Sequence, residues 1–350
     1  MAKDGLQINI GKNHKPFIIA EISANHKQSI SRVFKMIDEA KKCNASAIKL
    51  QTYKADKITL NIKNRNFFIN DKKSLWKNRY LHELYKEGEM PWEWTDKIFN
   101  YARQKKIICF STPFDETAVD MLEQVNCPIY KIASFELTDY ILLEKVAKTK
   151  KPVILSTGMA TKKEIKDSIS ILKKNGSKKI TLLKCTSTYP AKIEDLNLLT
   201  IKDMEKTFKC NIGYSDHSEG IIAAATAVSI GAVVIEKHFT LSKKDGALDS
   251  KFSADPAELK NLVEACNNAK KALGIIYYGP SINEKNSIKK RRSLYFISNL
   301  KKHDIIKKND IGSFRPALGI EVKYYKEIIG KKLIKKTYYG QPVKKNFFKK

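Results

Sequence analysis

Two histidines stand directly after two consecutive apolar runs in the second half of the chain. His217 ends the segment 213–217 (GYSDH), and His238 lies within the segment 236–240 (EKHFT). If the runs are neighbouring strands of one sheet, about 5 Å apart, the two imidazoles could share a divalent cation and leave positions open for a substrate. Mn²⁺ or a similar ion would act there as a Lewis acid on a carbonyl oxygen. The alternative interpretation is two unrelated, hydrogen-bonded histidines.

Lysines also interrupt four of the apolar runs. They are Lys49, Lys131, Lys184 and Lys237. A buried ammonium group needs a partner to offset its desolvation, and lysines that converge from several strand ends suit a phosphate or carboxylate ligand. The alternative is that each side chain points outward to a carboxylate on a helix. Because all four occupy matching positions, the pattern favours anion binding.

Further polar side chains stand at or just after the ends of the same runs. They are Glu21, Asn25, His26, Gln51, Ser111, Thr112, Ser134, Glu136, Ser156, Thr157, Thr186, Tyr189, Ser215, Asp216 and Glu236. Every run therefore ends in groups that can bind or transfer charge. In a barrel of parallel strands these ends meet at one face, which is where such enzymes place their chemistry.

The runs that must position these residues read as eight β-strands. They span residues 17–21, 47–51, 107–111, 129–134, 153–156, 180–185, 211–215 and 233–238. Several are continuous in Ile, Val and Leu, as in parallel strands covered on both faces. Helical patterns separate them, and Thr161 with Glu164 forms a capping box ahead of one such pattern. Eight strand–helix units over about 275 residues predict a (β/α)8 TIM barrel. A doubly wound sheet is the alternative, but no Gly-x-Gly-x-x-Gly turn follows the first strand.

Two segments depart from this rhythm. The segment 53–92 follows the second strand, and a connection of that length is typical of a functional lid. The pattern ends after residue 276, so we expect a catalytic barrel domain over 1–276, a linker over 277–290 and a small β-rich domain over 291–350. Short strands are predicted in that domain at 293–297, 305–306, 322–325 and 342–343.

Composition limits the classes of protein that remain. The net charge is +29, and residues 281–350 hold 20 basic and 5 acidic side chains. A basic nucleic-acid-binding protein is therefore the alternative from another class. Lysine is spread along the whole chain, however, and no finger or basic zipper occurs, so we expect no nucleic-acid partner. No apolar run reaches roughly 18 residues, the cysteines form no Cys-x-x-Cys pair, and no signal peptide is evident, so we expect a cytoplasmic protein without a membrane partner.

Taken together, these segments resemble the sialic acid synthase family. The matching barrel segments are 19–26 (IAEISANH), 49–52 (KLQT), 110–115 (FSTPFD), 131–134 (KIAS), 155–160 (LSTGMA), 213–217 and 236–240. In the tail, 291–294 (RRSL) and 315–316 (RP) look like the antifreeze-like (SAF) domain of that family. The resemblance covers nearly the whole chain in order. It implies a TIM barrel followed by a SAF domain.

The resemblance also implies an activity. Members of the family are transferases that condense phosphoenolpyruvate with an amino-sugar aldehyde, with the aid of a divalent metal: Mn²⁺ is expected here, with Mg²⁺ or Co²⁺ as alternatives. The segments 184–190 and 249–253 and the surroundings of Trp76 resemble the branch that uses 2,4-diacetamido-2,4,6-trideoxy-L-altrose. N-acetylmannosamine and the legionaminic acid precursor remain alternative acceptors. The family resemblance further implies a homodimer in which the SAF domain covers the barrel of the partner.

By position, the resemblance implies roles for individual residues. The phosphate and carboxylate of phosphoenolpyruvate would be held by Lys49, Thr112, Lys131, Ser134, Ser156 and Ser215, with Lys184 also binding substrate. The sugar and the reacting carbons would be surrounded by Glu21, Gln51, Tyr189 and Asp249. His217 and His238 would ligate the metal, and Arg315 would reach the acyl-amino groups from the SAF domain of a second subunit. Glu21, Lys131 and the two histidines would be catalytic, with Glu21 as the acid or base; the alternative for Glu21 is a structural carboxylate paired with a lysine.

Overall fold

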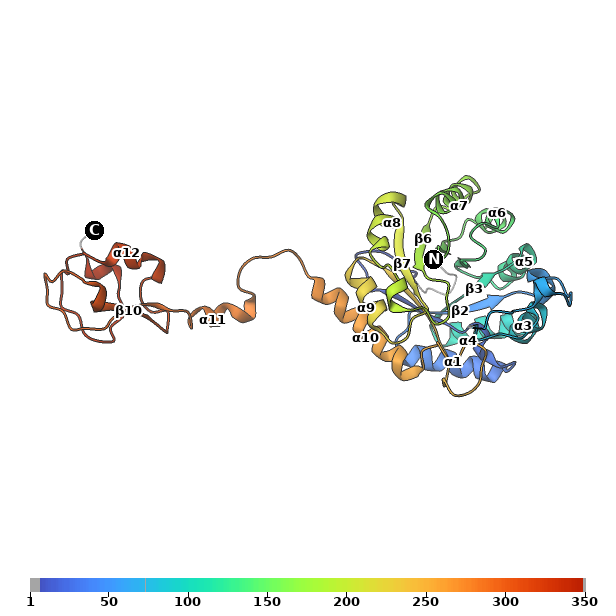
Figure 1. Ribbon diagram of the computed structural model, residues 1–350, viewed down its shortest axis with the longest axis horizontal. Helices are drawn as coiled ribbons and strands as arrows, with labels where there is room; N and C mark the ends of the chain where they lie inside the picture. Colours follow the sequence, from blue (N-terminus) through green and yellow to red (C-terminus); the bar gives the residue numbers. More distant parts are fainter. Residues whose placement is uncertain (1–6, 73, 349–350) are drawn as a thin grey trace. The chain divides into compact units, whose positions relative to one another are not determined.

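The chain divides into two compact units after Gly274 (Figure 1) in the computed structural model, which describes residues 7–72 and 74–348. The large unit contains a closed barrel of eight parallel strands, paired in the order in which they occur in the sequence. This confirms the predicted (β/α)8 barrel. The strands are β1 Phe17–Glu21, β2 Ala47–Thr52, β3 Ile108–Pro113, β4 Tyr130–Ile132, β5 Val153–Ser156, β6 Ile180–Cys185, β7 Asn211–Asp216 and β8 Val234–His238.

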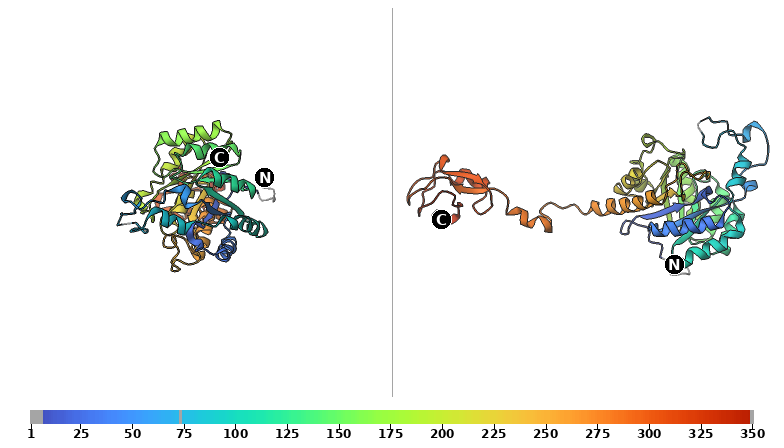
Figure 2. Two further views of the ribbon diagram at one scale, coloured as in Figure 1. Left: turned by 90° about the vertical axis from the view of Figure 1, so that its right-hand side faces the viewer. Right: turned by 90° about the horizontal axis from the view of Figure 1, so that it is seen from below.

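Helices surround this barrel on its outside (Figure 1, Figure 2). They are α1 Ile30–Lys42, α2 Ala55–Ile58, α3 Leu81–Gly88, α4 Thr95–Gln104, α5 Glu116–Gln124, α6 Tyr140–Lys148, α7 Lys162–Lys174, α8 Thr200–Phe208, α9 Ile222–Ser229 and α10 Pro256–Leu273. The predicted capping box of Thr161 and Glu164 is present at the start of α7 and satisfies amide groups that have no partner within the helix. Within residues 7–72 and 74–348, no helix is both long and apolar enough to cross a membrane.

The register of the barrel decides which strand residues face its interior. Successive side chains of a strand point to opposite faces, and residues paired in adjacent parallel strands share a face. Glu21 is paired with both Lys49 and His238, and these three side chains face the interior. Lys184 is paired with Tyr214, and each of these lies one residue before an inward-facing position of its strand, so both face outward. The four lysines therefore divide into an inward pair, Lys49 and Lys131, and an outward pair, Lys184 and Lys237.

Lys237 shows the consequence of this alternation most clearly. Its Nζ donates to Asp216 Oδ2 at 2.9 Å and to the Ser218 carbonyl, and both charged side chains are buried. The expectation that all four lysines converge on one ligand is therefore wrong for Lys237. The outward alternative holds for it, although the carboxylate comes from the neighbouring strand β7 and not from a helix.

The long connection after β2 is folded. It contains α2 and α3, and the buried carboxylate of Glu89 accepts from the Ala55 amide at 2.8 Å and from Lys54 at 3.1 Å. The indole Nε1 of Trp92 donates to the Tyr53 carbonyl at 3.2 Å, which ties the two ends of the connection together. The connection is thus an ordered insertion whose first and last residues are hydrogen-bonded to each other.

The small unit is built around its own apolar core. Strands β9 Ser293–Phe296 and β10 Ile311–Phe314 pair as an antiparallel sheet, and two short helices, α11 Lys285–Ile288 and α12 Tyr325–Ile328, belong to the same unit. The strand predicted at 322–325 is wrong, because Val322–Tyr324 is a 3₁₀ helix that leads into α12. Ile328 is buried there while Val322 is not, so the segment follows helical rather than alternating spacing. The assignment of the units as catalytic and SAF domains stays a prediction.

We predict that the substitution Lys237→Met lowers the stability of the barrel by about 3–5 kcal/mol, because it leaves the buried Asp216 carboxylate without a counter-charge. All three tryptophans of the chain lie in the large unit, so urea unfolding followed by tryptophan fluorescence reports that unit alone. The double variant Lys237→Met/Asp216→Asn should recover part of the loss. An unchanged urea midpoint in Lys237→Met would contradict this interpretation of the ion pair.

Candidate active site

Four charged side chains from four strands meet inside the barrel; we call Glu21, Lys49, Lys131 and Glu236 the charge cluster. Lys49 forms an ion pair with Glu21. Glu236 Oε1 lies 3.2 Å from Lys131 Nζ and 3.8 Å from Lys49 Nζ. All four side chains are buried, so their charges act at low dielectric and must compensate one another. The structure thus brings three of the predicted site residues together around a carboxylate, Glu236, to which the sequence assigned no role.

Within the charge cluster, burial and the neighbouring charges shift each pKa in opposite directions. Burial outweighs Lys49 and raises the pKa of Glu21, and burial outweighs Glu236 and lowers the pKa of Lys131. For Glu236, the attraction of Lys131 and Lys49 overcomes burial, so its pKa falls below the usual value. For Lys49, the attraction of Glu21 and Glu236 overcomes burial, so its pKa rises. Glu236 and Lys49 are therefore held ionised, while Glu21 and Lys131 are the members whose protonation is easiest to change.

Hydroxyl groups from neighbouring strands surround the charge cluster. Thr112 Oγ1 accepts from Lys49 Nζ at 3.1 Å, and Ser215 Oγ donates to Glu236 Oε1 at 3.2 Å. Ser156 Oγ is buried without a hydrogen-bond partner, which is unusual for a buried hydroxyl and leaves it available to a ligand atom. Gln51 is paired with Thr112 and therefore faces the same interior.

Ser134 extends this set of hydroxyls beyond β4. Its Oγ accepts from the Gly158 amide at 3.1 Å, in the loop after β5. A Cβ at position 158 would lie 2.8 Å from that oxygen, so only glycine allows this close approach. The loop after β5 is thereby fixed against the end of β4.

The two histidines lie next to one another at the ends of β7 and β8, with ring centroids 5.4 Å apart. His217 Nδ1 lies 2.9 Å from the Thr186 carbonyl, which can only accept, so Nδ1 carries the proton and Nε2 keeps its lone pair. His238 Nδ1 is buried without a hydrogen-bond partner. Burial, together with His217 and Lys49, holds the pKa of His238 well below its usual value. His238 is thus held as a neutral nitrogen donor, which a divalent cation requires, and neutral His217 would present Nε2 beside it.

Few other metal-binding side chains are close to this pair. No group of three or more His, Cys, Asp or Glu side chains able to hold a metal occurs in the part of the chain that the structure describes. Asp249 Oδ2 lies 3.9 Å from His238 Nδ1, while accepting from Ser23 Oγ at 2.5 Å. Two imidazoles therefore fit a catalytic metal with open positions, and not a closed structural site.

Cys185 also contacts the histidine pair. Its Sγ lies 3.8 Å from His217 Nδ1. Burial would raise the pKa of this thiol, but His217 and Ser134 lower it to about 7. In turn the pKa of His217, which burial would lower, is raised by Cys185 and the Thr186 carbonyl. No sequence pattern singled out Cys185, although it lies two residues beyond the inward-facing Leu183 and shares its face.

Aromatic rings cover the histidine pair. Tyr189 lies 4.3 Å from His217 and Phe252 lies 5.0 Å from His238, measured between ring centroids. Trp76, from the long connection after β2, lies 5.8 Å from Tyr189. The connection predicted as a lid thus contacts residues at the carboxyl end of the barrel.

Glu136 is a second carboxylate with a shifted pKa. Its Oε2 is buried without a hydrogen-bond partner. Burial, only partly offset by its own backbone amide and Lys131, raises the pKa of Glu136 to about 7. A carboxyl that titrates near neutral pH can both donate and accept a proton under physiological conditions. The sequence placed Glu136 at a strand end without assigning it a role, because its degree of burial could not be read from the pattern.

Lys184 points away from the charge cluster, and Arg315 belongs to the small unit. Lys184 Nζ donates to the Cys185 carbonyl at 2.9 Å and to Thr186 Oγ1 at 3.2 Å, and its position in β6 faces outward. Arg315 follows β10 in the small unit, where it is exposed. Substrate binding by Lys184 and by Arg315 therefore stays a prediction.

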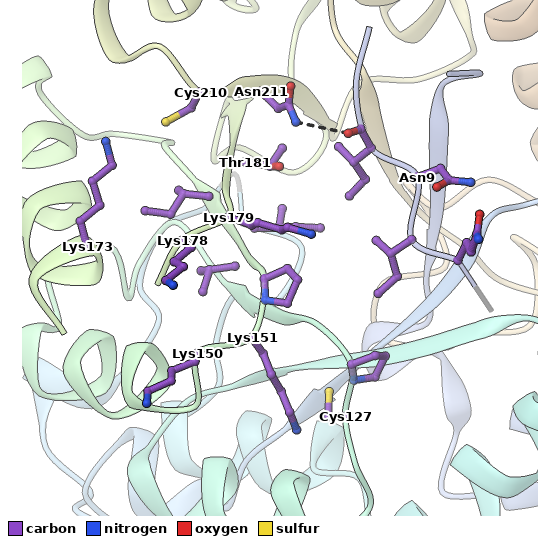
Figure 3. Close-up of a pocket in the computed structure, with 18 of the residues that line it drawn as sticks. Asn9, Cys127, Lys150, Lys151, Lys173, Lys178, Lys179, Thr181, Cys210 and Asn211 are labelled. Atoms are coloured by element: carbon purple, nitrogen blue, oxygen red, sulfur yellow. Dashed lines mark hydrogen bonds between the residues drawn. The ribbon is translucent and has the colours of Figure 1, made fainter. Parts of the chain in front are cut away.

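A large cavity of about 1180 Å³ lies at the opposite end of the barrel, where β5, β6 and β7 begin (Figure 3). Six lysines line it: Lys150, Lys151, Lys173, Lys178, Lys179 and Lys209. Several of these follow or end helices α6, α7 and α8, where cations offset the negative ends of the helix dipoles. The amino-terminal face of such barrels serves stability, and none of the predicted site residues lines this cavity.

Comparison with known proteins points in the same direction as the geometry. Residues 36–277 match the model of the NeuB family. The chain is 42% identical over 344 residues to pseudaminic acid synthase of Campylobacter jejuni strain 81-176, covering 97% of this chain and 99% of that protein. It is 43% identical to pseudaminic acid synthase of Helicobacter pylori, covering 91% and 94%. It is 36% identical to N,N'-diacetyllegionaminic acid synthase of Campylobacter jejuni, covering 91% and 95%.

A solved structure shows the same similarity. N-acetylneuraminic acid (sialic acid) synthetase of Leptospira borgpetersenii, crystallised with citrate, superposes with a TM-score of 0.71 at 35% sequence identity. The match covers 81% of this chain and 93% of that chain.

Proposed function

Because the chain belongs to the NeuB family, we propose that it is a transferase that condenses phosphoenolpyruvate with 2,4-diacetamido-2,4,6-trideoxy-L-altrose and water to give pseudaminic acid and phosphate. The relatives named pseudaminic acid synthase share more identical residues with it than the relative named for diacetyllegionaminic acid. The observation that supports the chemistry is the charge cluster directly beside the histidine pair. N-acetylneuraminate or diacetyllegionaminate synthesis is the alternative with the same chemistry.

The charge cluster and its hydroxyls would bind phosphoenolpyruvate. This substrate carries both a phosphate and a carboxylate, so its transfer from water requires cationic and hydroxyl donors. Lys49 and Lys131 supply positive charge, and Thr112, Ser156 and Ser215 supply hydroxyls around them. The unpartnered Ser156 Oγ would donate to a substrate oxygen.

The histidine pair would hold the divalent metal expected for the family. The ligand atoms would be His217 Nε2, because Nδ1 of that ring donates to the Thr186 carbonyl, and His238 Nδ1, which is buried without a hydrogen-bond partner. When bound, Mn²⁺, or alternatively Mg²⁺ or Co²⁺, polarises a carbonyl oxygen and makes the attached carbon electrophilic.

The reaction forms one carbon–carbon bond and replaces the C2–O bond to phosphate by a C2–O bond to the oxygen of water. C3 of phosphoenolpyruvate attacks the aldehyde carbon of the open-chain sugar, and water adds at C2. The water loses one proton while the aldehyde oxygen gains one, and the second water proton passes to phosphate as the C2–O bond breaks and the ketone forms. A single carboxyl can accept the first proton and return it.

Glu136 is suited to that proton transfer, because its pKa of about 7 makes both protonation states accessible. Glu21, the acid or base predicted from the sequence, stays a candidate as well, since its pKa is also raised by burial, with Lys49 opposing the shift. The aromatic cover of Tyr189 and Phe252 limits the entry of further water, which would otherwise intercept the intermediate.

We predict that phosphate is released from phosphoenolpyruvate in the presence of Mn²⁺ and 2,4-diacetamido-2,4,6-trideoxy-L-altrose, with kcat/KM at least about tenfold above that with N-acetylmannosamine or the legionaminic acid precursor. A coupled phosphate assay across the three acceptors measures this ratio. Turnover with N-acetylmannosamine alone would reject the proposed acceptor but keep the reaction class.

We predict that His217→Ala and His238→Ala each weaken Mn²⁺ binding by more than about tenfold, because each removes a nitrogen ligand. Calorimetric titration of the full chain measures the affinity, and circular dichroism checks the fold. His14→Ala, at an exposed position, is the matched control and should bind Mn²⁺ like the unsubstituted chain. Normal affinity in both site variants would exclude the pair as ligands.

We predict that kcat/KM rises with pH through an apparent pKa near 7, because Glu136 must be deprotonated to accept the proton from water. In Glu136→Gln activity falls and this part of the profile disappears, while the ionisation of the substrate phosphate remains. Glu144→Gln, at an exposed position on α6, should keep the full profile. A Glu136→Gln variant with the unchanged profile would assign the proton transfer to another group.

A further inference from the structure

Trp76 is attached to the carboxyl end of the barrel by its polar atom. Its indole Nε1 donates to the Leu248 carbonyl at 3.2 Å, in the loop after β8. An indole has a single hydrogen-bond donor, so this bond uses its only polar group. The rest of the ring is apolar surface, and the residue is partly exposed.

The ring of Trp76 is the outermost member of an aromatic wall; we give this name to Trp76, Tyr189 and Phe252. Trp76 lies 5.8 Å from Tyr189 and 6.3 Å from Phe252, and those two rings lie 5.2 Å apart. The three residues come from the connection after β2, the loop after β6 and the loop after β8.

The wall has an order from the inside outward. Tyr189 and Phe252 contact the histidine pair, whereas Trp76 packs against Tyr189 and Phe252. An aldehyde carbon placed at the histidines would therefore have the first carbons of the sugar beside Tyr189 and Phe252. The far end of the sugar would extend toward Trp76.

We propose that Trp76 is a specificity-determining residue that recognises the deoxy, methyl-bearing end of the acceptor sugar. This inference rests on the proposed function. The charge cluster and the histidine pair below the wall are polar, whereas the ring of Trp76 at the outer edge is apolar. A C6 methyl group can pack on this ring and lose its contact with water at no cost in hydrogen bonds. A sugar with a hydroxyl at C6 must desolvate that group against the same ring, which has no donor or acceptor left to offer.

The expected selectivity is moderate. Apolar contacts to a single methyl group discriminate by about 10- to 200-fold, and an apolar surface rejects an added hydroxyl by no more than about 100-fold. We therefore expect the full chain to prefer the 6-deoxy acceptor over its 6-hydroxy analogue by roughly tenfold or more in kcat/KM.

The test measures kcat/KM for both acceptors, and KM for phosphoenolpyruvate, in Trp76→Ala and Trp76→Phe. Trp76→Ala should lower the ratio of 6-deoxy to 6-hydroxy acceptor about tenfold with little change in KM for phosphoenolpyruvate. Trp76→Phe keeps an apolar ring and should keep most of the preference. The matched control is Trp92→Phe, which makes the same change at the base of the same connection, where the indole donates to the Tyr53 carbonyl.

A purely structural role for Trp76 gives a different result. If the indole only holds the connection in place, Trp76→Ala and Trp92→Phe each lower kcat/KM for both acceptors equally. The ratio of kcat/KM for the 6-deoxy and the 6-hydroxy acceptor then stays constant, and that outcome overturns the proposal. Turnover of the 6-deoxy acceptor by the unsubstituted chain is measured first. Its absence contradicts the proposed function itself, whereas its presence with a constant ratio contradicts only the role of Trp76.

Discussion

Charge compensation inside the barrel is the constraint on which the rest of the site depends. Two ammonium groups and two carboxylates lie in a space from which water is largely excluded, and each would be costly there without the others. Because the members come from β1, β2, β4 and β8, the closed barrel is required to bring them together. The same enclosure shifts the pKa values of Glu21 and Lys131 away from their usual range. Because the charges are balanced, an anionic substrate can bind here when Lys49 and Lys131 exchange a carboxylate partner for the substrate.

The remaining parts of the site are arranged around this cluster in layers. The histidine pair lies beside it at the ends of β7 and β8, and the aromatic wall covers the histidines. The innermost groups come from strands and the outermost from long connections. Rigid elements therefore carry the groups that must hold charge in fixed positions, and the connections carry those that contact the variable part of a substrate.

The sequence was most informative where one pattern repeats. Eight apolar runs separated by helical spacing were enough to predict the barrel, and the strand ends contained most of the site. The outward direction of Lys184 and Lys237 was missed because it depends on counting alternate residues from a known inward position, which a continuous apolar run does not mark. Counting back two residues from the inward-facing His238 would have placed the side chain of Glu236 inside the barrel. The contact of Trp76 with the loop after β8 spans 172 residues and depends on the path of an irregular connection, so no local pattern indicates it.

Strand β8 places three consecutive residues in alternate surroundings: Glu236 in the charge cluster, Lys237 in the ion pair behind the sheet and His238 in the histidine pair. Adding or deleting one residue in this strand would exchange its two faces, moving both inner groups behind the sheet and the ammonium group inside. Natural variation in length is therefore expected in the connections and not in this strand. Any redesign of the enzyme should treat 234–238 as a unit of fixed length.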